Sequence, residues 1–89
     1  MQAHIFISGF VQAVGFRAFV KAKAEEYGIG GWAKNTDDGR VEALLQGNED
    51  NINKVIEACN KGPFLSEVRD VVVEWEEGKK EFSDFQIVH

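Results

Sequence analysis

The sequence is short of cysteine and proline, with one of each among its 89 residues, and it lacks any long apolar run. Because a lone cysteine has no partner within the chain, Cys59 excludes an internal disulfide and is typical of a reducing compartment. No stretch approaches the roughly 18 apolar residues of a membrane-spanning helix. The residues after Met1 also lack the basic and apolar segments of a secretory signal. We therefore expect a cytoplasmic protein without a membrane partner.

Positive charge is also scarce, with 10 Lys and Arg against 15 Asp and Glu and a formal net charge of −5. An acidic chain repels the phosphate backbone, so we expect no nucleic-acid partner. A small anion could still bind, but only through donors aimed at one point against the mean field of the protein. The length and the 44% apolar content predict one domain spanning residues 1–89.

Hydrophobic periodicity predicts the order β-α-β-β-α-β, followed by an extra C-terminal strand. The predicted strands are 4–8, 31–36, 41–45, 68–76 and a short one around 85–87, and the helices are 16–27 and a segment from the Asn48 cap to Gly62-Pro63. Residues 77–80 are predicted to form a turn. This order is that of a ferredoxin-like α+β sandwich, in which an antiparallel sheet carries two helices on one face.

Arg17 lies in the first turn of a predicted helix, just after a loop bracketed by Gly9 and Gly15. A cation at a helix N-terminus typically loses about 0.3–1 kcal/mol to the helix dipole, and an anion bound between them would resolve this conflict. Glycines let loop N–H groups converge on such an anion, here those of residues 13–16. Arginine adds a planar fork that matches two phosphate oxygens. The pattern indicates a small phosphate cradle.

Two long blocks resemble the acylphosphatase family. Residues 9–17 read G-F-V-Q-A-V-G-F-R and resemble the family signature G-x-V-Q-G-V-G-F-R. Residues 31–42 read G-W-A-K-N-T-D-D-G-R-V-E and resemble its second block, G-W-x-x-N-x-x-D-G-x-V-E. Gly47 and Gly62-Pro63 also fall where the family has them. The resemblance spans the whole chain, and it implies a ferredoxin-like fold and hydrolysis of acyl phosphates.

The resemblance also implies roles for individual residues. Arg17 would bind the phosphate together with the loop, Asn35 would orient the attacking water, and Gly9 and Thr36 would support them. The implied phosphate-binding set is Gln12, Ala13, Val14, Gly15, Phe16 and Arg17. No metal, cofactor or covalent intermediate is implied, because an acyl phosphate is already activated and the enzyme mainly positions water and stabilises charge.

Several residues depart from the family pattern or stand outside it. Ala13 occupies a position that is usually glycine, and a left-handed backbone there would cost alanine roughly 1–2 kcal/mol. Phe10 replaces a commonly basic residue, which could weaken the steering of an anionic substrate. Cys59 lies on the apolar stripe of the second helix and is interpreted as a core residue. His4 and His89 are far in sequence from any ligand cluster, and no metal-ligand spacing is present.

Two alternatives fit a similar architecture. The first is a catalytically silent domain that binds a phosphorylated metabolite, which Asn35 disfavours because binding alone needs no water-positioning amide. The second is an RNA-recognition module, which needs exposed aromatics on the central strands and a basic face. The acidic composition and the single aromatic residue of the first strand, Phe6, disfavour it. We therefore expect a monomeric enzyme that acts on a small-molecule acyl phosphate.

Overall fold

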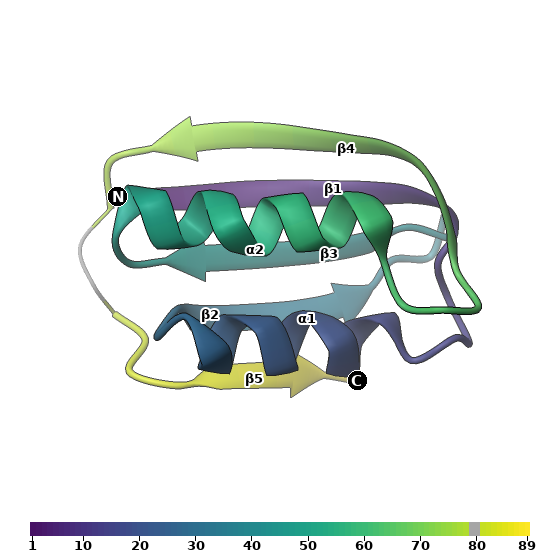
Figure 1. Cartoon of the computed structure of the whole chain (residues 1–89), viewed down its shortest axis with the longest axis horizontal. Coiled ribbons are helices and arrows are strands. Elements are labelled where there is room, and N and C mark those ends of the chain that lie inside the picture. The colour runs from purple at the N-terminus through teal and green to yellow at the C-terminus, as the bar shows by residue number, and fades with distance from the viewer. Residues whose placement is uncertain (79–80) are drawn as a thin grey trace.

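Two helices pack on one face of a five-stranded sheet (Figure 1). The computed structural model describes residues 1–78 and 81–89. The elements in chain order are β1 (Gln2–Phe10), α1 (Phe16–Glu26), β2 (Gly30–Asn35), β3 (Val41–Gln46), α2 (Glu49–Lys61), β4 (Glu67–Glu76) and β5 (Phe85–Val88). The predicted element order is confirmed. The turn predicted at 77–80 includes residues 79 and 80, which lie outside the described residues.

The strands lie in the order β4-β1-β3-β2-β5 (Figure 1). The pairs β1–β4, β1–β3 and β2–β3 are antiparallel, as predicted for a ferredoxin-like sandwich. The last strand differs, because β5 pairs with β2 in parallel and makes the sheet mixed rather than antiparallel throughout. The reason is directional: β4 runs against β1, so a chain that reverses after β4 must run with β1 and therefore with β2.

The core lies between the sheet and the two helices. Every second residue of β1, β2 and β3 points into it, as the predicted period-two pattern requires. The helices contribute Phe16, Val20 and Ala24 from α1 and Ile52, Val55 and Cys59 from α2. Cys59 is fully buried, which confirms its interpretation as a core residue. Burial raises the pKa of its thiol to about 12, so the thiol is neutral near pH 7 and a poor nucleophile.

The ends of both helices follow local chemistry. The side-chain oxygen of Asn48 accepts hydrogen bonds from the N–H groups of Asp50 at 2.9 Å and Asn51 at 3.3 Å, which caps α2 as predicted. Helix α1 ends one residue earlier than predicted, with Tyr27 as its C-cap. Gly28 follows in the left-handed region with φ of 67°. Neither helix is long and apolar enough to span a bilayer.

Candidate active site

The loop between β1 and α1 has an unusual backbone. Gly15, the N-cap of α1, has φ of 77°, and Ala13 has φ of 62°. The left-handed backbone considered for residue 13 is therefore present, and alanine occupies it despite its Cβ. Left-handed residues within such a turn bring successive N–H groups toward one side of the chain, a geometry that favours anions.

The backbone N–H groups of residues 13–17 have no acceptor among the residues that the structure describes. The bond that starts α1 is made by Phe19, whose N–H donates to the carbonyl of Gly15 at 3.0 Å. These unpaired donors coincide with the positive end of the α1 dipole, so an anion there would satisfy both.

Arg17 extends from the first turn of α1 toward the last strand. Its Nη1 donates to the carbonyl of Val88 at 3.0 Å and lies 3.4 Å from Nδ1 of His89. The C-terminal end of β5 lies beside the start of α1 (Figure 1). Arg17 therefore contacts Val88 and His89, although they follow it by 71 and 72 positions in the sequence. His89 is far in sequence from any ligand cluster, but the structure places its ring beside Arg17. No local sequence pattern predicts which helix the last strand will meet.

One cavity of about 240 Å³ brings the main predicted residues together. It lies between the loop, the first turn of α1, the end of β2 and the end of β5. Its lining is Val11, Ala13, Gly15, Phe16, Arg17, Ala18, Asn35, Ile87 and His89. Arg17 is the one Lys or Arg in this lining, and no Asp or Glu is among these residues. A small anion therefore meets one guanidinium and no opposing carboxylate side chain.

Gln12 and Val14 belong to the predicted phosphate-binding set but do not line this cavity. The side-chain amide of Gln12 instead donates to the carbonyl of Thr36 at 2.7 Å and to that of Arg40 at 3.0 Å. Both carbonyls flank the turn between β2 and β3. Gln12 thus ties the loop to the hairpin that carries Asn35, a structural contact that the sequence did not predict.

Asn35 is the last residue of β2 and is half-buried. Among the described residues, none makes a hydrogen bond to its side-chain amide, which leaves that amide able to bind a water in the cavity. The expected contact from Thr36 is not found. The Thr36 hydroxyl donates to Asp38 and also pairs with the backbone of Arg40, at 3.0 Å to its N–H and 3.1 Å to its carbonyl.

Thr36 therefore closes the turn after Asn35 rather than holding the asparagine directly. Its hydroxyl, followed by the Arg40 guanidinium, holds the pKa of Asp38 below the ordinary value. Nε of Arg40 donates to this carboxylate at 2.9 Å. The turn is thus closed by its own side chains, which fixes where β2 ends and where Asn35 stands.

Gly9 supports the loop through its backbone. Its φ of 126° lies in a region that L side chains rarely adopt, and the register between β1 and β4 shifts between Ser8 and Gly9. A Cβ at this position would collide with the backbone carbonyl of Glu67. The next residue, Phe10, is 60% exposed and leads the chain into the loop.

Residues 1–78 and 81–89, which the structure describes, contain no candidate metal site. No group of three His, Cys, Asp or Glu side chains there could hold a metal ion. The chemistry available in the cavity is that of backbone N–H groups, one guanidinium, one carboxamide and the imidazole of His89.

Comparisons with known proteins agree on one family. The family model described as Acylphosphatase matches residues 3–87. A curated acylphosphatase from Pyrobaculum calidifontis is 49% identical over 89 residues, covering 99% of this chain and 81% of the relative. The crystal structure of an acylphosphatase from Bacillus subtilis has a TM-score of 0.95 at 40% identity, covering 99% and 98% of the two chains. An acylphosphatase structure from Coxiella burnetii has a TM-score of 0.91 at 38% identity, covering 98% and 90%.

Proposed function

The chain belongs to the acylphosphatase family, and we propose that it hydrolyses acyl phosphates in the cavity between the β1–α1 loop, β2 and β5. The reaction cleaves a carboxylic–phosphoric anhydride into a carboxylate and inorganic phosphate. The observation that carries the proposal is the meeting of Arg17, Asn35 and the loop in one cavity without an acidic side chain.

The phosphoryl group binds first in this mechanism. Its oxygens accept hydrogen bonds from the loop N–H groups, which have no partner inside the described chain. Nη1 of Arg17 donates to the carbonyl of Val88. The other N–H groups of the guanidinium donate to the phosphoryl oxygens. The helix dipole and these donors act on the charge that develops on the phosphoryl oxygens during the reaction.

The attacking water is held by the Asn35 amide. As the oxygen–phosphorus bond to water forms, the bond from phosphorus to the acyl oxygen breaks, and the carboxylate departs with that electron pair. A proton of the water passes to a phosphate oxygen, so no protein base is needed. Positioning of the water and electrostatic stabilisation supply the rate enhancement.

The acylphosphatase activity does not specify which acyl group the substrate carries. In the proposed mechanism the cavity residues contact the phosphate end, so we propose that the substrate is a small acyl phosphate recognised mainly by that end. We further propose that residues 1–89 act as one domain and as a monomer, in the cytoplasm. Sedimentation equilibrium tests the oligomeric state, and a mass near the 10.0 kDa of one chain supports it.

The experiment that tests the function is hydrolysis of benzoyl phosphate with EDTA present, for the native chain and for Arg17→Ala. We expect turnover by the native chain and almost none by the variant. The circular dichroism spectrum of the variant should match that of the native chain. Absence of turnover in a folded native chain would contradict the proposal and favour a domain that binds phosphorylated metabolites without hydrolysing them. Equal turnover in both chains would remove Arg17 from the mechanism.

A further inference from the structure

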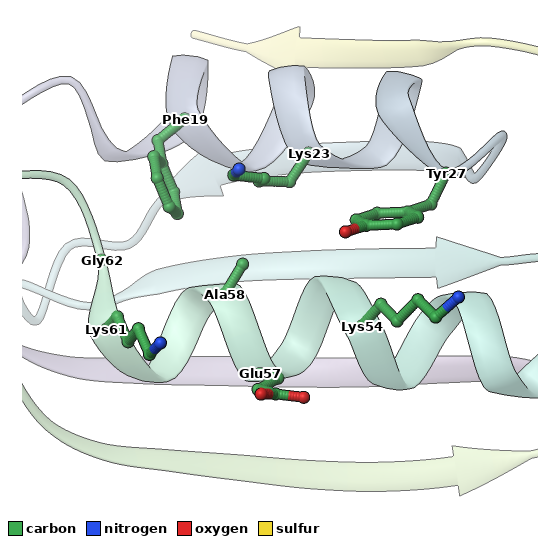
Figure 2. A pocket seen from close by; sticks show the side chains of 8 residues that line it. All are labelled: Phe19, Lys23, Tyr27, Lys54, Glu57, Ala58, Lys61 and Gly62. Carbon is green, nitrogen blue, oxygen red and sulfur yellow. The ribbon is translucent and has the colours of Figure 1, made fainter.

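A second cavity lies between the two helices and shares no lining residue with the first (Figure 2). Its volume is about 380 Å³, within the lower part of the range typical of small-molecule sites. The residues that line it come from one stripe on each helix and from the residues just after them: Phe19, Lys23, Tyr27, Lys54, Glu57, Ala58, Lys61 and Gly62. The proposed catalytic cavity does not use any of them.

The charge of this cavity runs against that of the protein. Three of its residues are lysines and one is a glutamate, although the whole chain carries −5. Figure 2 shows Glu57 on the side of α2 that faces away from α1. Nζ of Lys23 lies 3.8 Å from the carboxylate of Glu26, but Lys54 and Lys61 form no salt bridge with any described residue. Two ammonium groups are therefore available to an external anion.

Two aromatic rings lie among these lysines. Phe19 lies on α1 and Tyr27 is the C-cap residue of that helix, and Figure 2 shows both rings turned toward α2. Nζ of Lys23 lies 5.8 Å from the Phe19 ring centre, and Nζ of Lys54 lies 5.5 Å from that of Tyr27. Ala58 faces them from α2 with a single methyl group, which leaves the space between the helices open.

We propose that this cavity binds a small organic anion in which a flat ring carries a multiply charged phosphate chain, as in a nucleoside triphosphate. The ring would stack against Tyr27, one of these two aromatic side chains, and the phosphates would take the ammonium groups of Lys54 and Lys61. A phosphate chain with several charges can engage both available ammonium groups, whereas a single carboxylate carries only one charge. A ring without charge would leave the lysines unused, and a bare phosphate chain would leave the rings unused.

The test is titration with ATP, without added metal, followed through the ring signals of Tyr27 by NMR. Tyr27 is the only tyrosine in the chain, so its assignment is unambiguous. We expect a saturable shift in the native protein. In the double variant Lys54→Gln/Lys61→Gln we expect Kd to rise about tenfold or more, because charge-assisted contacts to phosphate are lost. The matched control is Lys21→Gln, which removes a lysine of α1 outside the cavity and should leave Kd unchanged.

Further ligands and variants separate the possible sources of a shift. Adenosine and inorganic tripolyphosphate should each bind more weakly than ATP if ring and charge both contribute. Arg17→Ala should leave the Tyr27 titration intact, because Arg17 belongs to the other cavity. The proposal is overturned if Tyr27 does not respond to ATP at millimolar concentration. It is also overturned if Lys21→Gln weakens binding as much as the double variant, or if Arg17→Ala alone abolishes the titration.

Discussion

Among the described residues, Ala13 is the one non-glycine residue with a positive φ. Its φ of 62° costs a residue with a Cβ roughly 1–2 kcal/mol, whereas glycine adopts it freely. Replacing alanine by glycine removes this strain, but glycine has more conformational freedom in the unfolded chain. That freedom offsets about 0.4–1 kcal/mol of the stability gained by removing the strain. We expect Ala13→Gly to raise the free energy of unfolding by about 0.5–1 kcal/mol, measured by urea denaturation.

The matched control for this variant is Ala18→Gly, five residues further along and exposed in α1. Glycine in a helix costs about 0.5–1 kcal/mol relative to alanine, so this change should lower the free energy of unfolding. Opposite signs for the two substitutions would identify the backbone angle as the cause. Destabilisation by Ala13→Gly would show that the left-handed conformation is not strained.

Arg17 and Asn35 should differ in how their loss affects kinetics. Asn35→Ala leaves the loop and guanidinium in place, so kcat for benzoyl phosphate should fall about 10²–10³-fold with little change in KM. Arg17→Lys keeps the charge but loses the planar fork, so both kcat and KM should worsen. Steady-state kinetics check this split. Asn53→Ala, an exposed position on α2, serves as the control, and near-normal kcat in Asn35→Ala would exclude the water-positioning role.

Between elements, the Gln12 side chain is the link between the loop and the β2–β3 hairpin. Its amide donates to two backbone carbonyls, at 2.7 and 3.0 Å, and a carboxylate has no N–H to donate. Gln12→Glu should therefore cost about 1–3 kcal/mol of stability and lower kcat, because Asn35 loses its fixed position relative to the loop. Urea denaturation and steady-state kinetics on one preparation measure both effects.

Gln86→Glu is the comparison for this variant, since Gln86 is exposed and its amide donates to the carboxylate of Asp84 rather than to the backbone of another element. It should leave kcat near the native value. If Gln12→Glu keeps native kcat while losing stability, the link holds the fold together but does not position Asn35.

The same contacts show where inference from sequence ends. Periodicity predicted the elements because each strand and helix buries one face, and the two sequence blocks pointed to Arg17 and Asn35, which line one cavity. Hydrophobic alternation does not report pairing, so the parallel placement of β5 beside β2 was not predictable from it. For the same reason the sequence did not predict the contacts of Arg17 with the carbonyl of Val88 and with His89. These residues follow Arg17 by 71 and 72 positions in the chain.

On the scale of the whole molecule, the net charge of −5 opposes an anionic substrate. The protein measures 31 × 22 × 20 Å. At an ionic strength of about 0.01 M the Debye length is about 30 Å, so a substrate approaching the cavity feels charges on the entire protein. At about 0.1 M it is about 10 Å, and only groups near the cavity act.

We therefore expect kcat/KM for benzoyl phosphate to rise as chloride salt increases across this range, while kcat stays constant. Stopped-flow or initial-rate measurements at low substrate concentration check it. A steady fall in kcat/KM with salt would mean that the local field of Arg17 and the loop dominates at all distances, contrary to this expectation. A parallel change in kcat would point instead to an effect of salt on the bound state.

The pairing of β5 also has a consequence for the order in which a ribosome builds the protein. The loop, α1 and β2 leave the ribosome early, but the backbone carbonyl that holds Arg17 belongs to residue 88. A nascent chain halted before β5 already carries both signature blocks, yet its arginine has no acceptor at the far edge of the sheet. The proposed phosphate site is then complete only after residue 88 has left the ribosome.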